Sequence, residues 1–294
     1  MSDDFYPAFL ASELSSEESN PDTALFEVIP CPLEKTVSYG AGTAAGPFAL
    51  LEASQELERF DGKGFPIKKG IITSDPIDCT QPIEAVMKDL REKTAASVKA
   101  GRIPVTLGGE HSLSYGAIMG VADALGKQIG IIQIDAHADL RVAYQGHKHS
   151  HASVMHLCAV ERRLPLMQFG IRALCIEEHE ARMNETHINF VDAEKLVTEN
   201  ISAYDLPEDF PEDVYVTFDV DGLDPSIMPA TGTPVPGGLS YYQSLHLVAH
   251  ALKGRNCVGF DVVELAPIEG QWAWDFTAAN LTYRLMGLVS RRKG

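Results

Sequence analysis

Short apolar runs rich in β-branched residues alternate along the chain with longer stretches in which apolar residues recur at helical spacing. The runs predict buried strands, and the longer stretches predict amphipathic helices. The predicted strands are Phe26–Ile29, Gly70–Thr73, Ile103–Leu107, Ile129–Ile134, Leu166–Gly170, Ile188–Val191, Val214–Phe218 and Val258–Val263. The predicted helices are Gly46–Phe60, Ile83–Ala100, Leu113–Leu125, Glu177–Met183, Tyr241–Lys253 and Thr277–Ser290.

This order of elements predicts an α/β fold in which helices cover both faces of a mostly parallel sheet. The pattern does not distinguish an open sheet from a closed eight-stranded barrel, and in both architectures ligands bind at the carboxyl ends of the strands. Residues 1–24 are acidic and serine-rich. We interpret them as a loose N-terminal arm or an oligomer contact, with a solvated tail as the alternative. Residues 25–294 show no internal repeat and no long linker, and we expect them to form a single domain.

The chain is strongly acidic, with a formal net charge of −17 at pH 7. This charge disfavours nucleic acid and anionic membranes as partners and favours a small cationic substrate. No apolar stretch approaches the ~20 residues of a membrane span, and no basic segment followed by an apolar run indicates a secretory signal. The five cysteines are scattered without a C-x-x-C pair. We therefore expect reduced thiols and a cytoplasmic protein.

Two acidic motifs directly follow predicted strands. The first is D-A-H-A-D, residues 135–139. Strand side chains alternate between faces, so Asp135, His137 and Asp139 can converge on one point, although a polar loop is the alternative. The second is F-D-V-D-G-L-D-P, residues 218–225. Asp219 and Asp221 share a face, and Asp224 is expected in a turn or in a contact that holds the ligand loop. Carboxylates packed this closely repel one another unless a cation or protons lie between them, although an ordinary Asp- and Gly-rich turn is the alternative.

A histidine lies at the junction of a third strand with its helix, in G-G-E-H-S, residues 108–112. The glycines allow close backbone approach, and Ser112 can cap the helix. By itself His111 would be interpreted as structural. Together with the residues of the two acidic motifs, however, it forms a set of two histidines and four aspartates at three strand ends. Hard oxygen donors without a thiolate favour Mn²⁺ or Mg²⁺ over structural zinc. Six ligands suit two ions about 3.5–4 Å apart with bridging carboxylates.

These three motifs, in this order, resemble those of the ureohydrolase family, which includes arginase, agmatinase, guanidinobutyrase and formiminoglutamase. The resemblance extends from about residue 25 to the end of the chain. It implies a three-layer α/β/α arginase-like fold with an eight-stranded parallel sheet, a ureohydrolase catalytic domain over 25–294, and two Mn²⁺ per subunit. The resemblance assigns His111, Asp135, Asp139 and Asp219 to one ion, and Asp135, His137, Asp219 and Asp221 to the other, with Asp135 and Asp219 bridging.

Further residues match functional positions of the family. S-H-A at residues 150–152 is similar to the setting of a catalytic histidine, which implies that His151 passes protons to the leaving amine. Glu264 ends a predicted strand, where its carboxylate can accept two parallel N–H bonds from a planar guanidinium; a salt-bridged structural glutamate is the alternative. Thr233, in T-G-T-P, resembles a loop that closes over the site. We interpret His147 and His149 as exposed loop side chains.

The sequence thus predicts a hydrolase that cleaves a guanidino compound to an amine and urea, with agmatine, which gives putrescine, as the expected substrate. The stretch after D-A-H-A-D lacks the asparagine that arginases use and is similar to the D-L-R pattern of prokaryotic agmatinases. Arg141 could instead pair with a substrate carboxylate, as in 4-guanidinobutyrate, although an ion pair with a nearby carboxylate is the structural alternative.

Other functions remain open at this point: an arginase, a binuclear phosphoesterase or amide hydrolase, and a catalytically silent scaffold. A phosphoesterase needs cationic groups near the site, and Arg141 and Arg172 are the nearby candidates. The silent scaffold is disfavoured because every ligand position, His151 and Glu264 carry competent residue types. Members of the family usually form trimers or hexamers, so we also expect a homo-oligomer.

Overall fold

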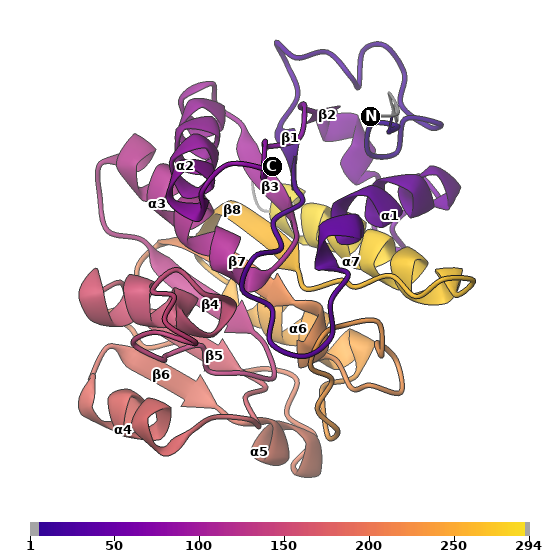
Figure 1. The fold of residues 1–294 in the computed structure, drawn as a ribbon. Coiled ribbons are helices and arrows are strands. Elements are labelled where there is room, and N and C mark those ends of the chain that lie inside the picture. The colour runs from indigo at the N-terminus through magenta and orange to yellow at the C-terminus, as the bar shows by residue number, and fades with distance from the viewer. Residues whose placement is uncertain (1–5, 292–294) are drawn as a thin grey trace.

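One open sheet of eight parallel strands forms the centre of the molecule (Figure 1). The computed structural model describes residues 6–291. The strands lie in the order β2-β1-β3-β8-β7-β4-β5-β6, and β2 and β6 form the two edges. The predicted open sheet is therefore confirmed, and the barrel is excluded. The strands are β1 (Phe26–Cys31), β2 (Ile71–Thr73), β3 (Ile103–Gly108), β4 (Gly130–Ile134), β5 (Leu166–Phe169), β6 (Ile188–Val191), β7 (Asp213–Asp219) and β8 (Asn256–Val263).

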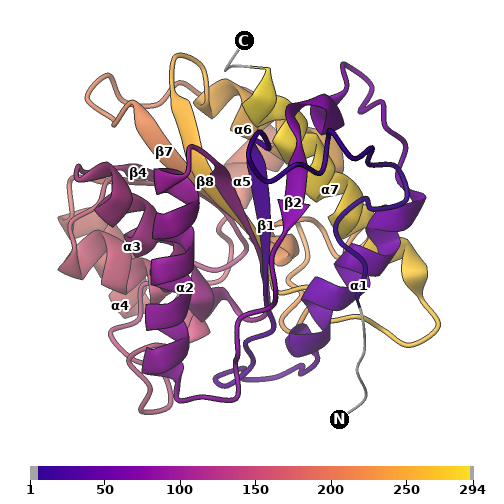
Figure 2. The same ribbon diagram turned by 90° about the horizontal axis from the view of Figure 1, so that it is seen from above.

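Helices cover both faces of this sheet. Figure 2 shows α2 and α3 on one side and α1 and α7 on the other. Each face encloses its own apolar core, because parallel strands buried on both sides present apolar side chains in both directions. The helices are α1 (Gly46–Ala53), α2 (Ile83–Lys99), α3 (Ser114–Leu125), α4 (Ile176–Asn184), α5 (Ala193–Thr198), α6 (Tyr241–Ala251) and α7 (Trp272–Ser290), with a π-helix over His156–Glu161.

The helices depart most from the predictions at α1, α5 and α7. Helix α1 ends at Ala53 rather than Phe60 and is followed by a 3-10 turn over Ser54–Glu56. The Ser54 hydroxyl donates to the Leu51 carbonyl and accepts the Leu10 N–H. These bonds tie down the N-terminal segment where the helix was expected to continue. Helix α5 is only 6 residues long, too short for a periodic signal. Helix α7 begins at Trp272 rather than Thr277; in its first turns Trp272 is exposed and Trp274 packs partly buried against the core.

The N-terminal segment is more closely attached than a loose arm would be. Of residues 1–24, residues 1–5 lie outside the described part of the chain. Phe9 and Leu10 are fully buried in the core on the α1 and α7 side. The Phe9 N–H donates to Thr73 Oγ1 at 2.9 Å. The acidic residues that follow are mostly exposed, as the composition of the segment predicts. The composition did not predict that Phe9 and Leu10 anchor the segment in the core.

The central strands place the expected ligands side by side. Strands β3, β8, β7 and β4 are consecutive neighbours in the sheet. Because all pairs are parallel, their carboxyl ends meet at one edge, where ligands bind in open α/β sheets. The motifs at residues 108–112, 135–139 and 218–225 and Glu264 each follow one of these four strands.

No disulfide is present in the described chain, and the thiols of Cys31 and Cys79 approach to 3.8 Å without a bond. None of the helices within residues 6–291 combines the length and the hydropathy that a membrane span requires.

Candidate metal centre and active site

A cavity of about 340 Å³ opens at the carboxyl edge of the central strands. Five of the six expected metal ligands line this cavity, and the sixth, Asp135, is fully buried next to them. The remaining predicted functional residues, His151, Thr233 and Glu264, also line this cavity. The fold therefore brings together every predicted site residue.

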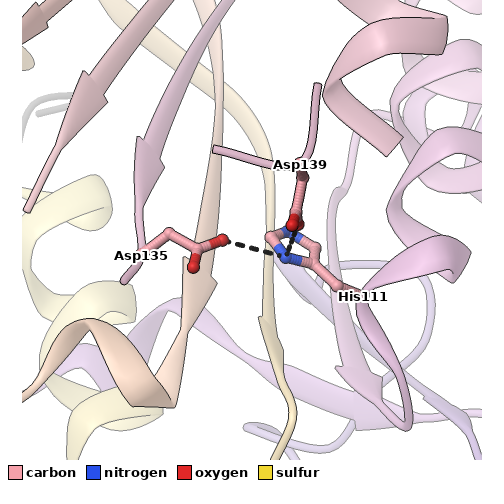
Figure 3. Close-up of side chains that lie close together, drawn as sticks. All are labelled: His111, Asp135 and Asp139. Carbon is pink, nitrogen blue, oxygen red and sulfur yellow. Dashed lines mark ion pairs between the residues drawn. The ribbon is translucent and has the colours of Figure 1, made fainter. Parts of the chain in front are cut away.

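His111 lies among three carboxylates. Its Nδ1 is 2.9 Å from Asp139 Oδ2, 3.1 Å from Asp135 Oδ2 and 3.4 Å from Asp219 Oδ2. Figure 3 shows the His111 ring between Asp135 and Asp139, which come from the loop after β4, whereas His111 follows β3. These ligand atoms converge from different strands on one point.

A second group shares Asp135 with the first. His137 Nδ1 is 3.0 Å from Asp221 Oδ2 and 3.7 Å from Asp135 Oδ1. The arrangement of ligand atoms could hold one ion between His111, Asp135 and Asp139, and another between Asp135, His137 and Asp221. Asp135 belongs to both groups because its two oxygens face opposite sides, which is the geometry of a bridging carboxylate.

The residues fit divalent ions with hard oxygen preferences. Two ligand atoms about 2.1 Å from one ion, at an angle of about 90°, lie about 3 Å apart, and three of the distances above are 2.9, 3.0 and 3.1 Å. His111 Nδ1 is buried and makes no well-aligned hydrogen bond within the described chain. A buried ring nitrogen aimed at carboxylates without a hydrogen bond is the position of a metal ligand atom.

The pKa shifts of the clustered residues also favour a bound cation. Burial and the charge of Asp135 raise the pKa of Asp139 to about 7. Burial and the charges of Asp221 and Asp135 raise the pKa of Asp219 well above its ordinary value. Burial alone would lower the pKa of His137, but the Asp221 and Asp135 carboxylates outweigh it and raise this pKa to about 12. The cluster thus holds more negative charge than its protein surroundings balance, and a cation would relieve the repulsion.

A buried chain of hydrogen bonds orients His111 from behind. His111 Nε2 lies 2.8 Å from Thr217 Oγ1, and the Thr217 hydroxyl donates to Asp261 Oδ1 at 2.7 Å. Asp261 also accepts the Tyr215 hydroxyl at 2.9 Å. Because the Thr217 proton goes to Asp261, the Thr217 oxygen accepts from Nε2–H, and this tautomer leaves the Nδ1 lone pair toward the carboxylates.

Asp135 has a similar support. The Gln133 side-chain amide donates to Asp135 Oδ2 at 2.7 Å, and Gln168 in turn donates to Gln133 Oε1 at 2.7 Å. Gln133, Thr217 and Asp261 were not singled out from the sequence. The available signal was their polarity within mostly apolar, mostly buried strands, where polar side chains need a partner.

Glu264 adopts a left-handed backbone conformation, with φ of 66°, directly after β8. Non-glycine residues rarely adopt this conformation, and it is concentrated at functional sites. The His111 N–H donates to Glu264 Oε1 at 2.6 Å, and the Glu264 N–H donates to the Gly109 carbonyl at 2.9 Å. Burial raises the pKa of Glu264 to about 8. The carboxylate is therefore fixed in the cavity wall beside the ligand cluster.

His151 also lines the cavity, in a 3-10 helix over His151–Ser153. Its Nδ1 is 3.2 Å from Thr36 Oγ1, and its Nε2 is 3.4 Å from Ser38 Oγ. The ring meets Tyr144 edge-on, with centroids 5.5 Å apart. Burial lowers the pKa of His151 below its ordinary value.

The two neighbouring histidines differ from each other. His147 is exposed, as expected. His149 is half-buried and its ring lies 5.5 Å from the Tyr115 ring, so the interpretation of His149 as an exposed loop side chain is wrong. Neither residue lines the cavity.

The outer part of the cavity contains residues that the motifs did not indicate. The loop over residues 37–40 forms part of the cavity lining. Position 40 has no room for a side chain, because a Cβ on Gly40 would lie 2.9 Å from the Gly232 carbonyl oxygen. The Gly40 N–H also donates to the Gly232 carbonyl at 3.2 Å, so Thr233 follows a residue in direct contact with the loop. The loop over residues 37–40 lines the cavity because two segments distant in sequence approach each other, and the sequence carries no local signal for that approach.

Both nearby arginines are already engaged by the protein. Arg141 Nε lies 3.9 Å from Glu178 Oε2, and its guanidinium lies over the Tyr144 ring at 5.2 Å. Arg172 donates to the carbonyls of Asp221 and Val235 at 2.7 and 2.8 Å. Arg172 thus holds the ligand loop in place, and it is not oriented to bind a phosphate.

Asp224 performs the turn role expected of it. Its Oδ1 accepts the N–H and hydroxyl of Ser226, and its Oδ2 accepts the N–H groups of Gly237 and Gly238, both at 2.9 Å. Burial opposes ionisation, but these bonds outweigh it and lower the pKa of Asp224 to about 2. Asp224 thereby closes the loop that carries Thr233.

An open parallel α/β sheet with a histidine and aspartate cluster at its carboxyl edge, beside a buried glutamate and a half-buried histidine, defines a metal-dependent hydrolase type of site. A model of the Arginase family matches residues 24–287. The chain belongs to this family, and it is an agmatinase-like ureohydrolase, an enzyme that hydrolyses C–N bonds.

Three relatives illustrate the similarity. The chain is 34% identical to an N(1)-aminopropylagmatine ureohydrolase from Synechocystis sp., over 95% of this chain and 92% of the relative. It is 32% identical to an agmatinase from Bacillus anthracis, over 88% of each chain. Among solved structures, agmatine ureohydrolase of Thermoplasma volcanium is 26% identical with a TM-score of 0.80, over 97% of this chain and 98% of that chain. The predicted family and the arginase-like fold are thus confirmed.

Proposed function

We propose that this enzyme hydrolyses agmatine to putrescine and urea, with two Mn²⁺ bound per subunit. The observation that carries the proposal is the shared carboxylate: Asp135 faces His111 with one oxygen and His137 with the other. His111, Asp135, Asp139 and Asp219 would hold one ion, and Asp135, His137, Asp219 and Asp221 the other. When bound, such a pair supplies Lewis-acid activation of water near neutral pH.

Glu264 would bind the guanidinium group. Its Oε1 already accepts the His111 N–H, and no hydrogen bond reaches Oε2 from the described residues. A cationic guanidinium would stabilise the ionised form of Glu264, whose pKa burial raises to about 8. The planar group would then lie with its carbon over the ligand cluster, because Glu264 is mounted directly beside His111.

His151 would transfer the proton that the departing amine needs. Water adds to the guanidinium carbon, the C–N bond to the amine breaks, and the amine nitrogen leaves with a proton, so that urea and the amine are the balanced products. We expect His151→Ala to lower kcat by ~10²–10³-fold with both metals retained. His149→Ala is the matched control, because His149 packs against Tyr115 outside the cavity; turnover lost only in the control would move the proton role to His149.

Agmatine suits this cavity because its outer amine is cationic and the protein is strongly acidic. The engagement of Arg141 by Glu178 and Tyr144 supports a substrate without a carboxylate. A second candidate is N(1)-aminopropylagmatine, which the Synechocystis relative is named for. The cavity is open at the highly exposed Tyr39, which leaves room for a longer polyamine tail.

The test is urea release with added Mn²⁺, with kcat/KM measured side by side for agmatine, N(1)-aminopropylagmatine, arginine and 4-guanidinobutyrate. Agmatine should exceed arginine and 4-guanidinobutyrate by at least ~10-fold, about 1.4 kcal/mol of transition-state discrimination. Preference for N(1)-aminopropylagmatine would keep the chemistry and change the substrate. Preference for a guanidino acid would end the agmatinase proposal, and no urea from any substrate would favour the silent scaffold.

We further propose that the chain from residue 25 onward acts as one catalytic domain in the cytoplasm, as a homo-oligomer such as a trimer or hexamer, and that it serves putrescine formation. The resemblance to ureohydrolases supports the assembly, and the absence of disulfides among the described residues supports the location. Thr233 is proposed to contact substrate, because it lines the cavity next to the contact between Gly232 and the loop over residues 37–40.

A further inference from the structure

Three segments far apart in the sequence meet at the hydroxyl of Thr36. The hydroxyl donates to Glu110 Oε1 at 2.8 Å. The same oxygen lies 3.1 Å from the backbone nitrogen of His151 and 3.2 Å from its Nδ1. Thr36 therefore connects the carboxylate of Glu110, which precedes His111, with the cavity-lining histidine His151.

A count of donors and acceptors determines the protonation of the His151 ring. A threonine hydroxyl has one hydrogen and two lone pairs. The hydrogen goes to the Glu110 carboxylate, and one lone pair accepts the His151 backbone N–H. The remaining lone pair faces Nδ1 and can only accept, so Nδ1 carries a hydrogen. The neutral imidazole then has its free lone pair on Nε2, the nitrogen near Ser38.

Glu110 holds Thr36 rigidly. The Glu110 side chain is fully buried and accepts four hydrogen bonds. Its Oε2 accepts the backbone N–H groups of Lys35 and Thr36 at 2.7 and 2.6 Å, and its Oε1 accepts the hydroxyls of Thr36 and Ser112. Both the backbone and the side chain of Thr36 are therefore attached to one carboxylate, which leaves the hydroxyl little freedom to turn away from His151.

We propose that Thr36 is a positioning residue that holds the His151 ring with hydrogen on Nδ1, so that Nε2 takes up the proton released by the attacking water and passes it to the departing amine. This inference rests on the proposed role of His151 as the proton carrier. It also gives Glu110 a role: the carboxylate next to metal ligand His111 ties the ligand loop and the proton carrier into one assembly. A misplacement of about 1 Å in such a group can lower turnover about 100-fold.

The test compares Thr36→Val, which keeps the shape and removes the hydroxyl, with Thr36→Ser, which keeps the hydroxyl. Under saturating Mn²⁺ and agmatine, or whichever guanidino substrate the enzyme turns over, Thr36→Val should lower kcat by ~10–100-fold. KM should change less than about threefold, since Thr36 acts on proton transfer rather than on guanidinium binding. Thr36→Ser should restore most of kcat. The matched control is Thr43→Val, at the start of the 3-10 helix over Thr43–Ala45, whose buried hydroxyl donates to Glu34 and not to His151.

A double mutant separates positioning from general damage. In a His151→Ala background, Thr36→Val should lower kcat no further, because residues that act as a unit are not additive. A merely structural threonine would add its full loss there. If Thr36→Val does not fold, Thr36→Ala removes the same hydroxyl and is read in the same way.

The outcomes distinguish the two hypotheses. If His151→Ala turns over like the wild type, the proposed role of His151 fails, and the role of Thr36 fails with it. If His151→Ala is impaired while Thr36→Val keeps normal kcat, only the positioning inference is overturned. An equal loss in Thr36→Val and Thr36→Ser, or a further loss in the double mutant, also overturns it.

Discussion

Thr217 and His111 face each other beneath the cavity, with 2.8 Å between Thr217 Oγ1 and His111 Nε2. We expect Thr217→Val to weaken Mn²⁺ binding about 10–100-fold, because the ring loses the acceptor that fixes its tautomer and orientation. Calorimetric titration of chelator-treated protein with Mn²⁺ measures this affinity directly, without activity. Thr217→Ser keeps the hydroxyl and should bind Mn²⁺ nearly as the wild type does; equal affinity in Thr217→Val would remove any orienting role for Thr217.

The second prediction concerns the bridging carboxylates. Asp135→Ala and Asp219→Ala should each lose both metal ions, because each side chain is proposed to contact both. Metal content by elemental analysis after dialysis gives the number of ions per chain. Asp123→Asn is a suitable control, since Asp123 pairs with Arg91 on the surface and should not affect metal content. A single tightly held zinc ion in a fully active wild-type enzyme would contradict the two-manganese proposal.

The third prediction concerns Glu264. Glu264→Gln keeps the shape and the acceptor for the His111 N–H but removes the charge that a guanidinium would pair with. Hydrogen bonds to charged groups contribute ~1.5–3 kcal/mol, so the dissociation constant of a guanidinium inhibitor should rise about 10–100-fold. Metal content should be unchanged. Unaltered inhibitor binding would assign Glu264 to the structural role that the sequence left open.

The fourth prediction concerns Arg141. Its guanidinium is engaged by Glu178 and Tyr144, so Arg141→Ala should not lower kcat/KM for agmatine by more than about threefold, which is under about 0.7 kcal/mol. Steady-state kinetics with agmatine and 4-guanidinobutyrate in parallel provide the comparison. A loss confined to 4-guanidinobutyrate would instead identify Arg141 as a carboxylate-binding residue.

The fifth prediction concerns pH and Asp224. The pKa of Asp224 is lowered to about 2 in the folded protein, against about 3.9 in an unfolded chain. A lowered folded pKa stabilises the fold above about pH 4, and this contribution disappears as the pH falls toward 2. Asp224→Asn should therefore lower Tm at pH 7, and the difference from the wild type should shrink toward pH 3. Thermal unfolding is measured with a chelator present, so that metal release does not affect the comparison. A Tm difference between Asp224→Asn and the wild type that does not change with pH would contradict the prediction.

The sequence predicted all eight strands because the period of a strand is a local property of the chain. The same locality revealed the ligand motifs, since residues spaced by two after a strand point the same way. Asp135 and His137, or Asp219 and Asp221, could be paired without knowledge of the fold. The short helix α5 and the true end of α1 could not be predicted, because tertiary hydrogen bonds and packing determined them.

What the sequence by itself determined, therefore, is which polar residues can meet at one cavity and at which end of the strands they lie. The tertiary structure alone decided which strands are neighbours. Strand β8 lies between β3 and β7, and this places Glu264 against His111, 153 residues away. It also brought Thr36 to His151, 115 residues away. The physical reason is that strand order and loop contacts follow from burial of apolar surface across the whole sheet, and no short stretch of sequence encodes that sum.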